Sequence, residues 1–236
     1  MSLKDKLTIV IPCKNEGMTI KTTLQFLNCQ SGVEGVNVIV ADSSDDFDFT
    51  RNLILSENSK KILIKIIDGG FPAFARNQGS KLVTTPYVLF LDADVFITEF
   101  CFLERVMDEM DEKDCELLTC KFRTKNFKYN FVYWTFDIVQ WFLSLTSPFA
   151  VGGFMLFKKS KFDELGGFCD DDKFAEDYHL SSKVKPSNFR ISNNYVSTLN
   201  RRFKQKGVWY MVKMMVKTWL NRHDDNFYKQ EHNYWK

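Results

Sequence analysis

Apolar runs of strand type alternate with segments of helical periodicity, and this alternation is the feature that most constrains the fold. The strand-type runs are residues 7–11, 36–41, 62–67 and 88–91, with a shorter run at 115–120. The helical segments between them are residues 17–28, 47–57, 75–82 and 99–110. Apolar strands separated by helices are typical of a mostly parallel sheet that is covered on both faces. We therefore expect an α/β fold with a Rossmann-like, mostly parallel sheet and helices on both faces.

The composition indicates a globular chain that forms a single domain. Its 236 residues are 44% hydrophobic and carry a formal net charge of +2, which is enough apolar material for one sizeable core. The six cysteines show no CxxC pair, so we expect most of them to be buried thiols in a reducing cytosol. The first apolar run is too short for a signal peptide, and no uninterrupted apolar stretch reaches the length of a membrane span. These features predict a cytoplasmic protein.

Two carboxylates, Asp92 and Asp94, directly follow the apolar run 88–91. Side chains alternate along a strand, so residues two apart face the same way. Two such carboxylates repel each other unless a cation lies between them, and a divalent ion such as Mg²⁺ or Mn²⁺ suits the place, with room for phosphate oxygens. The alternative is that Asp92 caps the next helix and Asp94 is solvated.

Polar residues follow all four predicted strands of the first half. These segments are residues 12–17, 42–46, 68–70 together with 75–79, and 92–94. In open α/β sheets, ligands bind beyond the carboxyl ends of the strands. Four polar segments that converge there predict a ligand site. The chain lacks the GxGxxG of a dinucleotide-binding enzyme after its first strand and the GxxxxGK[ST] of a P-loop, so neither a Rossmann dehydrogenase nor a P-loop kinase fits.

Six short motifs between Leu7 and Lys183 form a pattern that is more specific than any one of them. They are Ile9–Glu16, Val40–Asp46, Ala75–Gly79, the Asp92-Ala93-Asp94 of a DxD motif, Val151–Gly153 and Glu176-Asp177. In order and spacing they resemble the family 2 inverting glycosyltransferases, which have the GT-A fold. The resemblance implies the transfer of a sugar from a nucleotide diphosphate sugar, of UDP or GDP type, to an acceptor hydroxyl with inversion at the anomeric carbon.

The resemblance also implies roles for the residues after the first three strands. Pro12, Glu16 and Asp42 are expected to line the base and ribose, with Asp42 as the hydrogen-bond partner of the nucleobase. Arg76 is expected to contact the nucleotide, because a guanidinium suits a diphosphate or a base edge. The alternative for Arg76 is a salt bridge to Asp42 or Asp92.

For the two acids of the DxD motif, the resemblance implies that Asp92 approaches the ribose and that Asp94 binds a divalent cation, Mn²⁺ or Mg²⁺. Such an ion neutralises the charge that grows on the departing diphosphate. The sequence therefore predicts a metal-dependent enzyme with Asp94 as the metal ligand.

The second half is expected to supply the acceptor site and the general base. Gly152 and Gly153 precede an apolar run and allow the backbone to approach a bound sugar closely, with an ordinary turn as the alternative. Glu176 and Asp177 begin a helical segment, where free amides hold carboxylates ionised. The resemblance places the general base on Asp177, with Glu176 as the next candidate. Without the resemblance, Glu176 and Asp177 would be interpreted simply as acidic residues at the start of a helix.

Two departures limit the resemblance. The QxxRW signature and the transmembrane helices of processive members are absent. Arg201 and Arg202 lie roughly where members often place a basic residue or a histidine near the diphosphate, but no motif aligns there, so the sequence assigns them no role.

Two aromatic segments suggest contact with a membrane surface. Residues 131–149 are rich in aromatic side chains and are expected to pack over the acceptor site. Residues 201–236 contain nine Lys or Arg against three Asp or Glu, and Val208–Leu220 has the pattern of an amphipathic helix. Basic residues beside Trp and Met suit the cytoplasmic face of a membrane that contains anionic lipid. The alternative is a terminal helix that docks its apolar face on the core. The basic charge lacks any signature of nucleic-acid binding.

The whole pattern predicts a metal-dependent, inverting, non-processive glycosyltransferase of glycan or glycolipid biosynthesis. Its expected partners are a nucleotide-sugar donor and a glycan or lipid-linked acceptor. We expect a catalytic domain at residues 1–200, with a nucleotide-sugar-binding half at 1–121 and an acceptor half at 122–200, followed by a basic extension at 201–236. One alternative is a polyprenyl-phosphate sugar synthase. An alternative of another class is a non-catalytic nucleotide-sugar-binding or scaffold protein.

Overall fold

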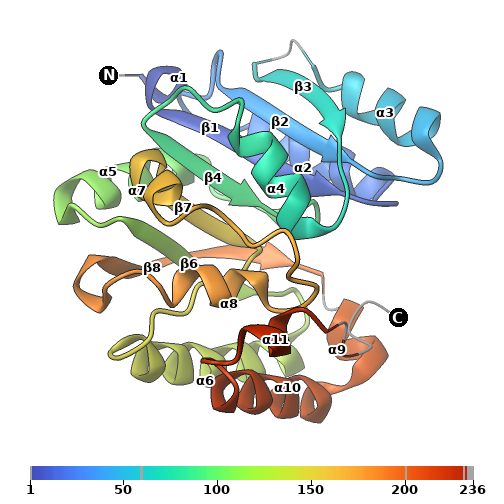
Figure 1. The fold of residues 1–236 in the computed structure, drawn as a ribbon. Coiled ribbons are helices and arrows are strands. Elements are labelled where there is room, and N and C mark those ends of the chain that lie inside the picture. Colours follow the sequence, from blue (N-terminus) through green and yellow to red (C-terminus); the bar gives the residue numbers. More distant parts are fainter. Residues whose placement is uncertain (1, 59–60, 200, 231, 233–236) are drawn as a thin grey trace.

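The computed structural model describes residues 2–58, 61–199, 201–230 and 232, and one sheet runs through the middle of the molecule (Figure 1). The strands are β1 (Leu7–Cys13), β2 (Asn37–Asp42), β3 (Leu63–Asp68), β4 (Tyr87–Leu91), β5 (Val95–Phe96), β6 (Leu117–Arg123), β7 (Phe154–Lys158) and β8 (Phe189–Thr198). The helices are α1 (Leu3–Lys6), α2 (Met18–Asn28), α3 (Phe47–Leu55), α4 (Pro72–Ser80), α5 (Phe102–Lys113), α6 (Phe127–Ser144), α7 (Lys159–Glu164), α8 (Glu176–Ser181), α9 (Arg201–Lys206), α10 (Val208–Leu220) and α11 (Asp225–Tyr228).

The eight strands have the order β3-β2-β1-β4-β7-β6-β8-β5. Strands β1 to β4 are parallel to one another, and β7 joins them in antiparallel orientation beside β4. Strand β6 is parallel to β8 and antiparallel to β7. The sheet is therefore mixed, and its parallel part is the half that the sequence predicts. The expected division between residues 121 and 122 falls inside β6, so one sheet passes through both halves.

Two separate apolar clusters cover the two faces of the sheet. Successive residues of one strand go to opposite clusters, as Ile9 and Val10 of β1 do. Helices α2 and α5 cover the face that holds Ile9, and helices α4, α7 and α8 contribute to the cluster that holds Val10. This arrangement follows from the period of two along a strand. It confirms the α/β fold with helices on both faces.

Helix α4 packs very closely on β1 because it has a glycine at the contact. A Cβ atom on Gly79 would lie 2.3 Å from Cγ1 of Val10, which is closer than any real contact. The short distance between helix and strand holds α4 against the sheet. Arg76, one turn earlier on α4, is thereby positioned at the carboxyl ends of β1 and β4.

Several expectations differ from the structure. Strand β8 was not predicted, because Phe189–Thr198 contains a polar run and a register shift opposite β6 that break the apolar alternation. Half of the six cysteines are buried rather than most of them: Cys13, Cys115 and Cys120. Most of the large apolar side chains of α6 are exposed, and the packing of residues 131–149 over an acceptor site stays a prediction.

Helices α6 and α10 lie at one end of the molecule, the lower end in Figure 1, away from the strands β1 to β3. The expected amphipathic helix at Val208–Leu220 is present with those bounds as α10. Helix α11 follows it, and Tyr228 of α11 is fully buried in a small cluster with Tyr178 of α8 and Met214 of α10. The C-terminal segment thus docks on the helix that begins with Glu176 and Asp177.

Candidate active site

Polar residues from four segments meet where β1, β2 and β4 end. Strand β1 pairs with β2 so that Cys13 lies opposite Asp42. The register between β1 and β4 pairs Val10 with Phe90, which brings Asp92 to the level of Pro12. The carboxyl ends of parallel strands therefore form one edge, as expected for an open α/β sheet. Helix α8 adds its two acids to this edge from a distant part of the chain.

Arg76 links the first half of the chain to the second. Its Nη1 atom lies 2.7 Å from Oε1 of Glu176, and its Nη2 atom lies 2.7 Å from Oδ1 of Asp92 and 3.4 Å from the carbonyl oxygen of Gly152. The Arg76 residue is only 2% exposed. Burial lowers the pKa of the guanidinium, but the charges of Asp92 and Glu176 outweigh that effect and raise it above its ordinary value. The salt bridge to Asp92 is the alternative that the sequence left open.

Asp177 is held differently from its neighbour Glu176. Its Oδ2 atom accepts a hydrogen bond from the Gly152 amide at 2.7 Å, and its Oδ1 atom accepts one from the Tyr178 amide at 2.8 Å. Burial, followed by the negative charge of Glu176, raises the pKa of Asp177 to about 6, and the two amide hydrogen bonds and Arg76 oppose the rise. A carboxylate with such a pKa is a better proton acceptor than an ordinary aspartate, whereas Glu176 is neutralised by Arg76.

The two glycines before β7 let these groups come together. A Cβ atom on Gly152 would lie 3.1 Å from Nη2 of Arg76 and 3.2 Å from Oδ2 of Asp177. A Cβ atom on Gly153 would lie 2.9 Å from the Phe122 ring. The carbonyl oxygen of Gly153 accepts a hydrogen bond from the Asp92 amide at 3.2 Å. In the structure, the backbone at Gly152 and Gly153 closely approaches protein side chains. Contact of Gly153 with a sugar stays a prediction.

Asp94 and Glu16 share a single cation, Arg201 of α9. One Nη2 atom of Arg201 lies 2.8 Å from Oδ2 of Asp94 and 2.8 and 2.9 Å from the two carboxylate oxygens of Glu16. Burial, opposed by Arg201 and supported by the charges of nearby acids, raises the pKa of Glu16. The sequence offered no motif for Arg201, because its partners lie 185 and 107 residues away along the chain. The side chain of Arg202 is outside what the structure describes.

Asp42 is buried at the end of β2 with one oxygen satisfied and one not. Its Oδ1 atom accepts hydrogen bonds from the Ser44 amide at 3.1 Å and from Ser44 Oγ at 2.6 Å. Its Oδ2 atom has no hydrogen-bond partner among the described residues, and Arg51 Nε lies 3.6 Å away. A buried carboxylate oxygen without a hydrogen bond is costly. This oxygen is therefore a candidate for bonding to a ligand group.

Asn15, which sequence reasoning did not single out, ties the loops after β1 and β2 together. It adopts a left-handed backbone conformation with φ of 55°, which asparagine tolerates better than most residues. Its amide donates to Ser44 Oγ, and its side chain exchanges two hydrogen bonds with Asp45, each at 2.8 Å. The signal in the sequence is weak, since an Asn before a Glu-Gly pair is typical of many turns. These contacts hold the loop that carries Glu16 against the loop after β2.

The residues around Asp94 fit a divalent cation of the hard type. No group of three or more His, Cys, Asp or Glu is arranged as metal ligands within the described residues. Mg²⁺ sites that use substrate phosphates need only one or two protein carboxylates, however. The carboxylates of Asp94 and Glu16 both lie 2.8 Å from the same nitrogen of Arg201. The space between the two carboxylates therefore favours a positive charge.

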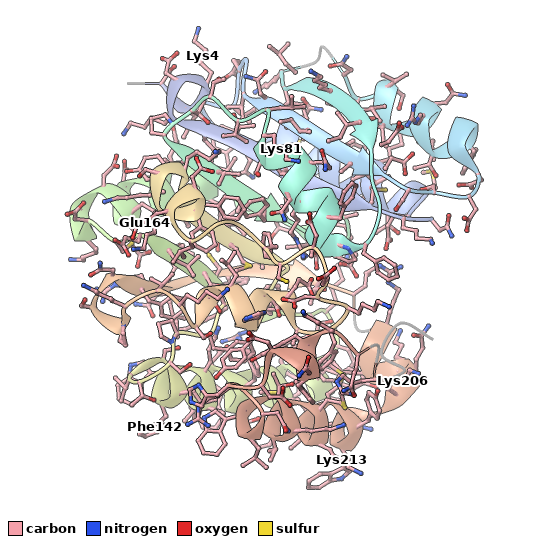
Figure 2. All side chains as sticks on the ribbon, viewed as in Figure 1. Lys4, Lys81, Phe142, Glu164, Lys206 and Lys213 are labelled. Carbon is pink, nitrogen blue, oxygen red and sulfur yellow. The ribbon has the colours of Figure 1, made fainter. Side chains whose placement is uncertain are left out.

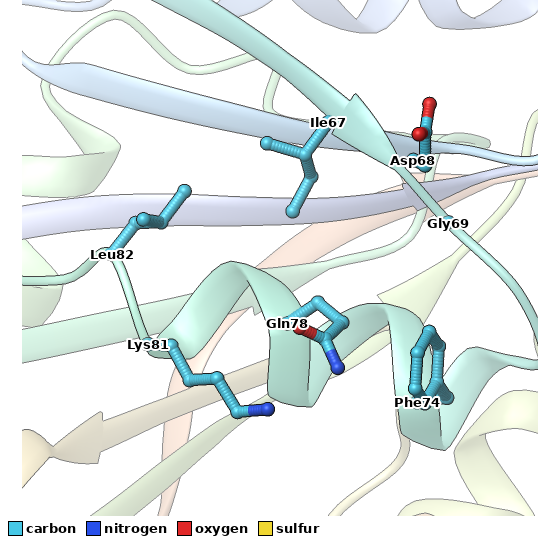
Figure 3. A pocket seen from close by; sticks show the side chains of 7 residues that line it. All are labelled: Ile67, Asp68, Gly69, Phe74, Gln78, Lys81 and Leu82. Carbon is cyan, nitrogen blue, oxygen red and sulfur yellow. The ribbon is translucent and has the colours of Figure 1, made fainter.

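A separate pocket of about 470 Å³ lies between β3 and α4 (Figure 3). It is lined by Ile67, Asp68, Gly69, Phe74, Gln78, Lys81 and Leu82. Asp68, Gly69 and Gln78 belong to the polar segments that follow the predicted strands, but no residue to which the sequence analysis assigns an individual role lines this pocket. The acids and arginines described above, and not this pocket, are therefore the candidate site.

The comparison with known families decides the assignment. The profile described as glycosyl transferase family 2 matches residues 8–166, which include Asp42, Arg76 and the DxD motif. The chain belongs to glycosyl transferase family 2. The match ends before Glu176 and Asp177, so the roles of these two acids rest on the geometry and on the resemblance of the motifs.

Relatives of known sequence agree with the family. A poly-beta-1,6-N-acetyl-D-glucosamine synthase of Staphylococcus aureus is 25% identical over 223 residues, which cover 86% of this chain and 53% of the synthase. The amylovoran biosynthesis glycosyltransferase AmsB of Erwinia amylovora is 38% identical over 90 residues, which cover 37% of this chain and 30% of AmsB. The chain thus spans about half the length of the staphylococcal synthase.

Solved structures share the fold. The mannosyltransferase PcManGT of Pyrobaculum calidifontis, in complex with GDP-Man and Mn²⁺, superposes with a TM-score of 0.70 at 19% identity, over 92% of this chain and 62% of that one. Staphylococcus aureus TarS in complex with UDP-GlcNAc superposes with a TM-score of 0.62 at 18% identity, over 82% and 59%. These similarities confirm the expected GT-A architecture.

Proposed function

We propose that this chain transfers a sugar from a nucleotide diphosphate sugar to an acceptor hydroxyl with inversion, in glycan or glycolipid biosynthesis. The observation that carries the proposal is the pair formed by Asp177 and the Gly152 amide, next to the buried Arg76 between Asp92 and Glu176. It places one carboxylate with a raised pKa beside an acid and arginine network at the strand ends. Such a carboxylate suits the removal of one proton during a single displacement.

In the proposed reaction, Asp177 accepts the proton of the acceptor hydroxyl while the oxygen attacks the anomeric carbon. The bond between that carbon and the diphosphate oxygen breaks, and the nucleoside diphosphate leaves with the electron pair. During this step Arg76 holds Asp92 and Glu176 in place. Its two terminal nitrogens donate hydrogen bonds to these two carboxylates. Direct contact of Arg76 with the nucleotide stays a prediction.

The donor is expected to lie along the ends of β1 and β2. Pro12 and Glu16 flank this edge, and the unsatisfied Oδ2 atom of Asp42 is suited to accept a hydrogen bond from a nucleobase N–H. The structural neighbours support a nucleotide-sugar donor, because PcManGT is seen with GDP-Man and TarS with UDP-GlcNAc. A thermal-shift screen of UDP-, GDP-, CDP- and dTDP-sugars identifies the base, since ligand binding raises the apparent melting temperature. A chain that binds none of them would contradict the proposal.

A divalent cation, Mn²⁺ or Mg²⁺, is proposed to bind at Asp94, with Glu16 beside it. When bound, the ion supplies positive charge that stabilises the departing diphosphate. The PcManGT structure contains Mn²⁺ together with GDP-Man, which supports this proposal. An assay for donor hydrolysis or sugar transfer distinguishes an enzyme from a non-catalytic scaffold. Only an enzyme releases or transfers the sugar.

Replacing Asp94 by Asn is expected to keep the fold and to reduce Mn²⁺-dependent donor binding sharply. The substitution makes an anionic oxygen ligand neutral, and carboxylates are the ligands on which affinity for these ions depends. Calorimetry with UDP or GDP, with and without Mn²⁺, measures the effect. Asp163→Asn, on the exposed part of α7, is the matched control. Unchanged metal-linked affinity in the Asp94 variant would remove this residue from the site.

Replacing Arg201 by Ala is expected to raise the affinity for Mn²⁺ in the absence of nucleotide by several-fold. Arg201 forms ion pairs with Asp94 and Glu16, so it competes with a metal ion for the same carboxylates. Electron paramagnetic resonance of free Mn²⁺ gives the dissociation constant without any turnover. Arg190→Ala is the control, because Arg190 is paired with Glu109 outside the site. An equal or lower affinity in the Arg201 variant would show that this arginine does not compete with the ion.

A further inference from the structure

Helix α6 is amphipathic in the reverse of the usual sense. Its buried residues are polar: Asp137, Gln140 and Ser144. Its exposed large side chains are apolar: Phe127, Phe131, Trp134, Ile138, Val139, Trp141 and Phe142. Phe127 is 88% exposed and Phe131 is 67% exposed. A soluble monomer rarely leaves so many large apolar side chains together in water.

Specific hydrogen bonds hold α6 in this orientation. Asp137 accepts from Nη2 of Arg123 at 2.6 Å, and Gln140 donates from Nε2 to the Phe149 carbonyl at 2.6 Å. Ser144 Oγ accepts from the Phe149 amide at 3.4 Å. Rotation of the helix to bury its aromatic face would break these bonds and leave Arg123 and the backbone groups of Phe149 without these partners. The outward aromatic face is therefore a built feature of the fold.

Helix α10 adds a second apolar face at the same end of the molecule. Its exposed large side chains are Trp209, Val212, Val216, Trp219 and Leu220, with Trp209 85% exposed. The two helices are joined through shared contacts: Phe203 of α9 stacks on Tyr129 of α6, and Phe149 contacts both Phe136 of α6 and the cluster around Met214 of α10. Figures 1 and 2 show α6 and α10 together at the lower end, where Phe142 and Lys213 project outward. We call the exposed side chains of these two helices the α6–α10 surface.

Cations outnumber anions around the α6–α10 surface, although the exposed acids Asp224 and Asp225 follow the C-terminal end of α10. Residues 178–223 contain no Asp or Glu, and residues 117–162 contain only Asp137, which is buried in its pair with Arg123. Lys125 and Lys128 lie at the start of α6, and Lys204 and Lys213 are exposed on α9 and α10. Trp and Phe beside Lys are the composition of helices that lie in the interface of a bilayer. A surface that is apolar and positive is complementary to anionic lipid headgroups over acyl chains.

We propose that the α6–α10 surface docks this protein on a membrane that contains anionic lipid. Within the part of the chain that the structure describes, no helix is long and apolar enough to cross a bilayer. The helices therefore lie along the bilayer surface. Buried Met214 and Thr218 of α10 and Tyr228 of α11 fasten α10 to the protein, so its outer face is free to enter the headgroup layer.

The docked face adjoins the acid pair. The cluster beneath α10 includes Tyr178, which directly follows Asp177, and its hydroxyl lies 3.1 Å from Ser147 Oγ in the segment after α6. A bilayer on this surface lies on the side of the molecule that carries Asp177. The inference concerns lipid binding alone, so its test does not depend on the proposed transfer reaction.

Intrinsic tryptophan fluorescence tests the proposal directly. Four of the five tryptophans lie on these two helices: Trp134, Trp141, Trp209 and Trp219. Vesicles of phosphatidylcholine with about a third of phosphatidylglycerol are expected to shift the emission to the blue and to sediment the full chain. Vesicles of phosphatidylcholine alone, or high salt, are expected to bind less, because exposed charges are screened. No shift and no sedimentation with anionic vesicles would overturn the proposal.

Two variants and two matched controls assign the binding to the surface. Phe131→Ser with Trp209→Ser is expected to lower vesicle partitioning at least tenfold, and Lys213→Glu about fivefold or more, with little change in melting temperature because these side chains are exposed. Lys217 is not used, because its ammonium lies over the Phe227 ring. Lys4→Glu, at the opposite end in Figure 2, and Phe100→Ser, 62% exposed after β5, are the controls and are expected to bind normally.

Light scattering separates a membrane from a second copy of the chain. The native protein is expected to be monomeric in the absence of lipid. A stable dimer that Phe131→Ser with Trp209→Ser dissociates would show that the surface is a protein interface and would overturn the membrane proposal. Undiminished vesicle binding by both surface variants would overturn it as well. Loss of vesicle binding with normal nucleotide binding would leave the proposed transfer reaction unaffected.

Discussion

Replacing Asp177 by Asn is expected to lower sugar transfer by about 10²-fold or more while nucleotide binding stays nearly intact. A general base contributes a factor of this size because it takes the proton as the oxygen attacks. Asparagine has nearly the same shape and can still accept one of the two amide hydrogen bonds that hold Asp177. Calorimetry gives donor binding and a transfer assay gives the rate. The two measurements should separate in this variant.

The pH dependence of the native protein gives a second test of the same residue. The pKa of Asp177 is raised to about 6, so the carboxylate is protonated below that pH and ionised above it. Transfer is therefore expected to rise from pH 5 to pH 7 and then to level off. An aspartate with the ordinary pKa would already be ionised at pH 5. Exposed Asp171, mutated to Asn, is the control, and its profile should match that of the native protein.

Transfer by the Asp177 variant at close to the native rate would show that the base lies elsewhere. Glu176 would then be the next candidate. Its ion pair with Arg76 at 2.7 Å argues against it, because this carboxylate is already engaged by a buried guanidinium.

Replacing Arg76 by Met is expected to destabilise the fold by about 3 kcal/mol. The Arg76 side chain is 3% exposed and neutralises Glu176, whose side chain is 9% exposed. Removing one partner of a buried ion pair leaves an uncompensated charge, which costs about 3–5 kcal/mol. Methionine keeps much of the apolar volume of the arginine stem, so the loss reports mainly on charge. Denaturant unfolding measures the free energy.

A double substitution distinguishes lost charge from lost packing. Arg76→Met with Glu176→Gln is expected to recover part of the stability, because the buried carboxylate that Arg76 neutralised is then replaced by an uncharged amide. The loss in Arg76→Met should also be smaller at pH 5 than at pH 8, since Asp177, whose pKa is raised to about 6, loses its negative charge between these pH values as the pH falls. Arg190→Met should cost little and is the control, because Arg190 on β8 is about half exposed and lies 3.8 Å from its partner Glu109 on α5. Equal destabilisation by the single and the double variant at both pH values would contradict the role of Arg76 as a charge link.

Local periodicity in the sequence was sufficient to predict the strands of the first half and one helix of the second. The apolar runs before Pro12, Asp42 and Asp92 are buried strands, because alternate residues of each strand meet an apolar cluster on either face. The polar residues after them meet at one edge, since parallel strands end together. The bounds of α10 were also predictable, because a Gly precedes it and its residues between Val208 and Leu220 form one unbroken pattern.

The pairing of charges and the covering of apolar faces depend on contacts that form only in the folded chain. Arg201 reaches Asp94 and Glu16 because β8 returns the chain to the sheet, and no local pattern announces a contact across 107 or 185 residues. Arg76 meets Glu176 because Gly152 lets their segments approach. The aromatic stripe of α6 resembles a core-facing stripe in sequence, since periodicity locates a face but not its neighbour. The hydrogen bonds of Asp137 and Gln140 turn that stripe outward, and such bonds exist only once the chain has folded.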